Sequence, residues 1–137
     1  MTYARFTVAY WCLFVAAFLP MACALIAKYG LLGVPPEKGG YDNHNPRAWL
    51  ARQTDWRARA NAAQANTFEA LPFFFAAVII ALLLQANQTL LDILALLFVV
   101  LRMGYIMMYV ADLASARSAV WALALLVNIA ILFSGYR

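Results

Sequence analysis

The sequence contains four long apolar runs, and no other feature restricts its fold as strongly. The runs extend over about residues 6–27, 62–84, 90–110 and, with its flanks counted, 118–135. A helix needs about 20 mostly apolar residues to cross a bilayer. Because unpaired backbone groups are costly in hydrocarbon, runs without alternating polarity are expected to be helices. We therefore predict one all-α integral membrane domain over residues 1–137, folded as a bundle of four transmembrane helices.

The composition excludes the other common classes of chain. Hydrophobic residues make up 66% of the sequence and charged residues 12%, with a mean hydropathy of +0.77. A small soluble domain cannot hide so much apolar surface, and disordered chains are poor in apolar residues. The net charge of +4 comes from side chains that form no continuous basic tract, so we expect no nucleic-acid partner.

The basic residues predict the orientation in the membrane. The connection over about residues 28–61 carries most of them, namely Lys28, Lys38, Arg47, Arg52, Arg57 and Arg59. Arg117 falls on the same side of the bundle, whereas Arg5 and Arg137 fall on the other. Cytoplasmic loops carry an excess of Lys and Arg. The long loop is therefore expected in the cytoplasm, with both termini on the opposite side of the membrane.

The first apolar run and the long loop each contain residues that predict local helix geometry. Pro20 is expected to kink a retained first helix, although residues 19–23 also faintly resemble a lipoprotein cleavage site. In the long loop, Asn45 and Pro46 predict a helix start. The absence of Gly and Pro over 47–59 allows that helix to run unbroken into the second span. Trp49 and Trp56 are seven residues apart and would then share a face, as interfacial anchors without chemistry do.

The sequence offers no metal site and no catalytic side-chain set of its own. Cys12 and Cys23 would lie about 16 Å apart along one helix, too far for a disulfide, so we interpret them as packing residues. His44 is the only histidine and lies in the loop, away from any cluster with metal-ligand spacing. A Ser-His-Asp arrangement and a thiol oxidoreductase are both disfavoured.

Polar residues inside the spans fall into stripes at helical spacing. The three stripes are Arg59, Ala62, Asn66, Glu69 and Phe73; Arg102, Tyr105, Tyr109 and Asp112; and Arg117, Trp121, Ala124 and Asn128. Glu69 and Arg102 could form an interhelical ion pair, and Asn128 a single hydrogen bond between helices. As an ensemble, however, the stripes favour a site with a cationic centre for an anionic or zwitterionic ligand, because Arg grips carboxylates at two points.

The second span carries a recognisable motif. Gln64–Phe74 resembles the N-x-x-E-x-x-P-x-F signature of the membrane-associated proteins in eicosanoid and glutathione metabolism, the MAPEG family. Ala114–Trp121 is similar to the segment that opens the family's fourth helix, and Tyr41–Arg47 to a stretch of its prokaryotic members. The resemblance covers nearly the whole chain and suggests a protein of the bacterial inner membrane.

The resemblance implies a homotrimer with sites at subunit interfaces near the cytoplasmic face. These sites would bind glutathione as cosubstrate. A lipophilic small molecule would enter them from the surrounding membrane lipids. Arg117 matches the arginine that stabilises the glutathione thiolate in a catalytic member. The matched glutathione-binding positions are Asn66, Glu69, Gln64, Arg102, Tyr105 and Tyr109, with Lys28 near a basic position of relatives.

The expected activity is that of a glutathione-dependent transferase or peroxidase. A free thiol has a pKa near 8.5, and a neighbouring cation lowers it and so raises the fraction of nucleophilic thiolate. One departure weakens the match, because Ala62 stands where several transferases have an arginine. Arg59, one turn earlier on the same stripe, is expected to bind glutathione by reaching across; otherwise the affinity for glutathione is low or the ligand differs. The family also includes a non-catalytic lipid-presenting scaffold, which remains the alternative. A small multidrug transporter is disfavoured, because the first run contains no acid.

Overall fold

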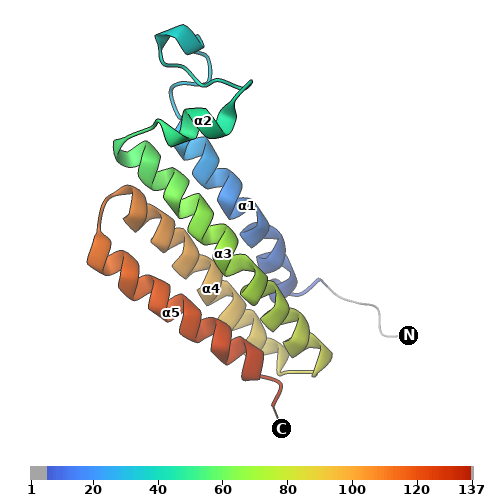
Figure 1. Cartoon of the computed structure of the whole chain (residues 1–137). Coiled ribbons are helices and arrows are strands. Elements are labelled where there is room, and N and C mark those ends of the chain that lie inside the picture. Colours follow the sequence, from blue (N-terminus) through green and yellow to red (C-terminus); the bar gives the residue numbers. More distant parts are fainter. Residues whose placement is uncertain (1–5, 137) are drawn as a thin grey trace.

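The computed structural model describes residues 6–136, and within them the fold is entirely helical. Four long helices run side by side in alternating directions (Figure 1): α1 (Val8–Lys28), α3 (Asp55–Leu83), α4 (Gln88–Val110) and α5 (Ala114–Phe133). Each is long and apolar enough to cross a membrane, which confirms the prediction of an all-α membrane bundle. Two short elements lie in the loop after α1: η1 (Pro36–Lys38) and α2 (Pro46–Ala51). α1 continues through Pro20.

Helices α3 and α4 form the centre of the bundle, since each packs against the other three long helices. Small side chains let α1 and α3 approach closely: Ala16 and Cys23 on α1 and Ala63 and Ala77 on α3 are fully buried. Small residues at helix contacts are the usual means of packing helices in lipid, where apolar burial gives little driving force. Both cysteines are free and buried, as expected of packing residues.

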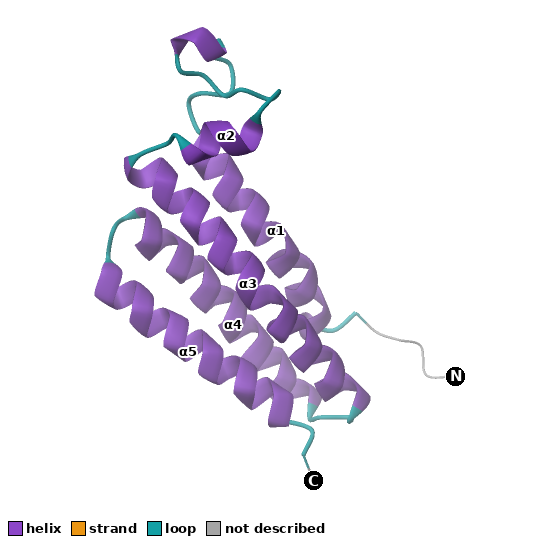
Figure 2. Ribbon diagram, in the orientation of Figure 1, coloured by secondary structure: helices purple, strands orange, loops and turns teal. Residues whose placement is uncertain are grey.

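The two ends of the bundle differ in their connections (Figure 2). The long loop with α2 and the short turn between α4 and α5 lie at one end, and the turn between α3 and α4 lies at the other. The basic loop residues and Arg117 therefore share an end, which we call the loop end. Arg5 and Arg137 lie outside the described residues.

The loop differs from the expectation of one unbroken helix over 47–59. Helix α2 ends at Ala51, and α3 begins at Asp55. Trp49 is buried, with its ring 5.2 Å from that of Tyr41, and the side chain of Gln53 donates to the Trp49 carbonyl. These tertiary contacts favour a turn after α2. The interpretation of Trp49 as an interfacial anchor is therefore wrong.

At the end of the bundle away from the long loop, a carboxylate ties α1 to α4. Asp92 Oδ1 accepts from the backbone N–H of Ala9, at 2.8 Å, and from Gln88 Nε2, also at 2.8 Å. The first N–H groups of a helix have no partner within the helix. Asp92 thus caps α1 from a neighbouring helix.

We expect Asp92→Leu to lower the free energy of unfolding by about 1–2 kcal/mol, the usual cost of losing a helix cap. Thermal unfolding of the purified protein in detergent micelles measures this change. Ile93→Leu, at the exposed neighbouring position, is the control and is expected to leave stability unaltered. Equal stability of the two variants would show that this contact does not hold α1 in place.

Candidate functional site

Two adjoining cavities lie between α3, α4 and α5. The first has a volume of about 190 Å³, and the second, nearer the loop end, of about 230 Å³. Asn66 and Trp121 line both. Together the cavities fall within the range of about 300–1,000 Å³ typical of small-molecule sites. The three polar stripes therefore converge on one hollow region of the bundle.

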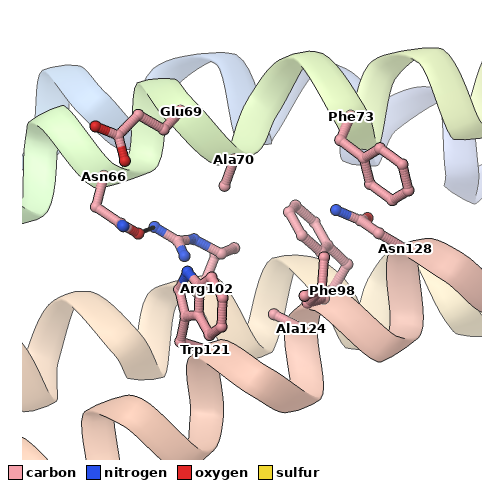
Figure 3. A pocket seen from close by; sticks show the side chains of 10 residues that line it. Asn66, Glu69, Ala70, Phe73, Phe98, Arg102, Trp121, Ala124 and Asn128 are labelled. Atoms are coloured by element: carbon pink, nitrogen blue, oxygen red, sulfur yellow. Dashed lines mark hydrogen bonds between the residues drawn. The ribbon is translucent and has the colours of Figure 1, made fainter.

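Arg102 is the cationic centre of the first cavity, as Figure 3 shows. Its side chain is only 1% exposed. Within residues 6–136 its Nη2 donates to two neutral oxygens of α3, Asn66 Oδ1 at 3.1 Å and Thr67 Oγ1 at 3.0 Å. Its Nε is buried and has no hydrogen-bond partner among the described residues. A buried charge is costly unless a counter-charge and hydrogen bonds compensate it, so this guanidinium has unused capacity for an anion.

The alternative of a structural ion pair between Glu69 and Arg102 finds no support in this geometry. Glu69 is exposed and lies at the rim of the first cavity, while the hydrogen bonds of Arg102 go to Asn66 and Thr67. The Glu69 carboxylate and the Arg102 guanidinium therefore line the cavity without neutralising each other. A zwitterionic ligand could use both.

Two tyrosines connect Arg102 to the second cation of the site. The guanidinium of Arg102 lies 4.1 Å from the ring centre of Tyr105, and that of Arg117 lies 4.2 Å from the ring centre of Tyr109. The two rings meet edge to face at 5.7 Å. Stacking on a ring face holds a guanidinium by cation–π attraction and leaves its planar edge of N–H donors for other partners. Tyr105, Tyr109 and Arg117 all line the second cavity.

The remainder of the first cavity is largely apolar. Phe73, Phe98 and Ala124 line it beyond Arg102, and the Phe98 ring is itself fixed by stacking on Phe74 at 4.1 Å. Asn128 lines the same part. The interhelical hydrogen bond considered for Asn128 is not seen for its Oδ1, which is buried without a partner among the described residues. This region can therefore hold an apolar group of a ligand beside a charged group that Arg102 binds.

Three expected glutathione-binding residues lie outside the two cavities of this single chain. Gln64 lines a separate hollow with Arg47 and Phe68, because two residues along a helix turn a side chain about 200° away from Asn66. Arg59 Nε donates to the Val110 carbonyl at 3.0 Å. The Nζ atom of Lys28 lies 4.3 Å from the centre of the Tyr41 ring.

Sequence reasoning missed Thr67 and Phe98. Thr67 is fully buried and donates to the Ala63 carbonyl one turn earlier, which leaves its oxygen to accept from Arg102. It lies off the stripe of Asn66 and Glu69, so periodicity could not select it. Phe98 lies one turn before Arg102 on α4, so helical periodicity could have placed it on the same face as Arg102.

A comparison with protein families covers nearly the whole chain. The MAPEG family profile matches residues 8–136. The chain belongs to the MAPEG family. The comparisons with curated proteins and with solved structures each gave no match. Membership in the MAPEG family supports a membrane-embedded protein with a glutathione-related transferase role or a related one, and it agrees with a cationic hollow opening between apolar helices.

We expect a double-mutant cycle to show that Arg102 is not retained for stability. Thr67→Val should lower the free energy of unfolding by about 1–3 kcal/mol, because it removes an acceptor from a buried charge. Arg102→Met should be neutral or stabilising, as replacements of buried ion groups by apolar ones often are. In the Arg102→Met background most of the Thr67→Val cost should disappear. Unfolding in detergent micelles measures all four proteins, and strong destabilisation by Arg102→Met would contradict the interpretation.

Proposed function

We propose that this MAPEG protein is a membrane-bound, glutathione-dependent transferase or peroxidase that acts on lipophilic electrophiles. The observation that carries the proposal is the buried guanidinium of Arg102, whose Nε has no partner among the described residues. A second guanidinium, that of Arg117, lies in the adjoining cavity. Two cations beside an apolar hollow fit an anionic cosubstrate and an apolar second substrate.

The functional groups of glutathione match the polar groups of the site. Its carboxylates suit the N–H edge of Arg102, because planar guanidinium groups bind carboxylates at two points. Its ammonium group suits the exposed carboxylate of Glu69, which lies at the rim of the same cavity. Its peptide groups suit the amide of Asn66, and Tyr105 and Tyr109 line the path towards Arg117.

Arg117 is proposed to stabilise the thiolate. A neighbouring cation favours the charged form of a thiol and so lowers its pKa, and an arginine does this without losing its own charge. The thiolate then attacks an electrophilic carbon and forms the C–S bond, while the leaving group takes the bond electrons. The protein's own thiols take no part, since Cys12 and Cys23 are buried among packing residues.

The electrophile is proposed to enter from the bilayer. Leu125 lines the first cavity and is also exposed on the surface of α5, so the hollow is continuous with a surface that lipid can reach. Apolar compounds concentrate in lipid by the hydrophobic effect. The bilayer would thus supply the second substrate directly to the apolar part of the site.

A homotrimer is part of the proposal. Glu69 is exposed in the single chain although it lies within a candidate membrane span, and a charge at the centre of a bilayer costs about 2.5–3.5 kcal/mol or more. Another copy of the chain covering this face would remove the carboxylate from lipid. The outward-facing Gln64 of one subunit would then be available to the site of the next, with Lys28 near the same end of the bundle.

The proposed location is the bacterial inner membrane, with the long loop in the cytoplasm and both termini opposite. The basic residues of the loop and Arg117 share the loop end of the bundle, which the positive-inside rule assigns to the cytoplasm. Cytoplasmic glutathione would then meet the second cavity, which is the one nearer this end.

A second candidate is a non-catalytic lipid-binding scaffold of the same family. It is favoured by Ala62, which leaves no cation four residues before Asn66, and by Arg59, which is engaged by the Val110 carbonyl. Glutathione binding separates the two candidates, because a scaffold needs none.

We expect Arg117→Ala to lower kcat for conjugation of chlorodinitrobenzene about tenfold or more at neutral pH, because a pKa lowered by about 1–2 units supplies most of the thiolate. The loss should shrink as the pH rises above the ordinary pKa of the thiol, where thiolate forms without help. Thiolate absorbance of the glutathione complex should fall in parallel. Arg117→Lys should retain part of the activity, and Arg52→Ala, at an exposed loop position, is the control. A native protein without bound thiolate at millimolar glutathione would favour the scaffold.

We expect Glu69→Leu to weaken glutathione binding about tenfold or more, since the ammonium group would lose its charged partner. Insertion into the membrane should survive. Titration calorimetry measures the affinity for glutathione, and the oligomeric state of the variant is determined in detergent. Leu83→Ile, at an exposed position of α3 that lines neither cavity, is the control. Unchanged binding and unchanged assembly would show that Glu69 belongs to no site.

A further inference from the structure

Asn128 is an amide placed at the apolar end of the first cavity. It lies on α5, is 3% exposed, and its Oδ1 is buried without a hydrogen-bond partner among the described residues. Figure 3 shows its amide between the rings of Phe73 and Phe98. An unpartnered polar atom in such surroundings destabilises the empty protein. A role in joining helices therefore does not account for its Oδ1.

Asn128 and Arg117 mark two ends of one path. They lie on the same face of α5, because eleven residues at 100° each bring a helix back to within about 20° of its starting direction. They are separated by about 16 Å along the helix axis. Trp121 lies between them and lines both cavities. A molecule reacting beside Arg117 could therefore reach Asn128 only with an extended apolar body.

We propose that Asn128 is a specificity-determining residue that binds a hydroxyl group at the far end of the electrophile's apolar chain. This inference rests on the proposed function, and it names the substrate class as long-chain electrophiles with a distal hydroxyl. A hydroxyl both donates and accepts, so it complements the amide whichever of its two atoms faces the cavity. A purely apolar chain offers no partner to the amide atom that faces the cavity and therefore binds less well.

The test compares hexenal, nonenal and dodecenal, each as the trans-alkenal with and without a terminal hydroxyl. In the assay the glutathione thiolate adds to the β-carbon, the electron pair moves to the carbonyl as an enolate, and solvent supplies the proton to the α-carbon. The terminal hydroxyl should raise kcat/KM about five- to tenfold for dodecenal, as one hydrogen bond can. It should not help hexenal, which is too short to reach Asn128.

Asn128→Leu should bring the ratio of hydroxylated to plain dodecenal close to one, while Asn128→Thr, which keeps a hydrogen-bonding group, should retain part of it. Ile129→Leu, at the exposed neighbouring position, is the control and should keep the full ratio. Asn128→Leu should also raise the unfolding temperature of the empty protein. A structural hydrogen bond would instead make this variant less stable and leave the ratio unchanged.

A binding experiment without glutathione separates this inference from the proposed function. Dodecanediol should raise the unfolding temperature of the native protein more than dodecanol does, because ligands stabilise the state that binds them, and Asn128→Leu should abolish the difference. Conjugation of all alkenals without a hydroxyl preference would overturn the inference and leave the proposed function standing. A diol preference without any conjugation would sustain the role of Asn128 and overturn the transferase. A hydroxyl preference that persists in Asn128→Leu would overturn the inference.

Discussion

The arrangement of the site depends on one interaction, the burial of the Arg102 guanidinium between α3 and α4. In a bundle of apolar helices such a charge is held only if neighbouring side chains solvate it. Asn66 and Thr67 supply two oxygens from consecutive positions of α3, and the Tyr105 ring supplies a face on the helix of Arg102 itself. These contacts fix the side chain but provide no negative charge. The centre of the bundle is thus organised around a cation with remaining capacity for an anion.

The sequence predicts those parts of the arrangement that follow from the free-energy cost of placing polar groups in lipid. Apolar runs must be helices in lipid, so the four spans can be read directly from composition along the chain. Polar residues inside such runs are expensive and turn inward, so helical periodicity selects Asn66, Arg102 and Arg117, which line the two cavities. Thr67 escapes this reasoning, because it lies off the stripe of Asn66 and Glu69 and because a threonine hydroxyl within a helix can donate to the backbone one turn earlier, as Thr67 does to Ala63.

Other features could not be predicted, because they depend on contacts between distant segments. The break between α2 and α3 accompanies the burial of Trp49 against Tyr41. Thr54, an N-cap residue type directly before α3, is a local signal for this break, but it does not outweigh the absence of Gly and Pro over 47–59 when the sequence is considered alone. Gln64 was identified by its position in the family motif. The motif does not indicate which face of α3 the Gln64 side chain occupies or which subunit's site it contributes to. Arg59 matched the polar stripe, yet the open end of α4 at Val110 accounts for its hydrogen bond.

The strongest argument that the hollow is built for a guest comes from its two unsatisfied atoms. Among the described residues, Arg102 Nε and Asn128 Oδ1 are the buried side-chain polar atoms without a partner, and both residues line the first cavity. Native proteins leave few such atoms, since each is destabilising. Helix packing alone would scatter them through the bundle or eliminate them. One unpaired atom near the charged end and one at the apolar end of the same cavity instead fit the two proposed guests, an anionic cosubstrate at Arg102 and an electrophile with a distal hydroxyl group at Asn128, held between α3, α4 and α5.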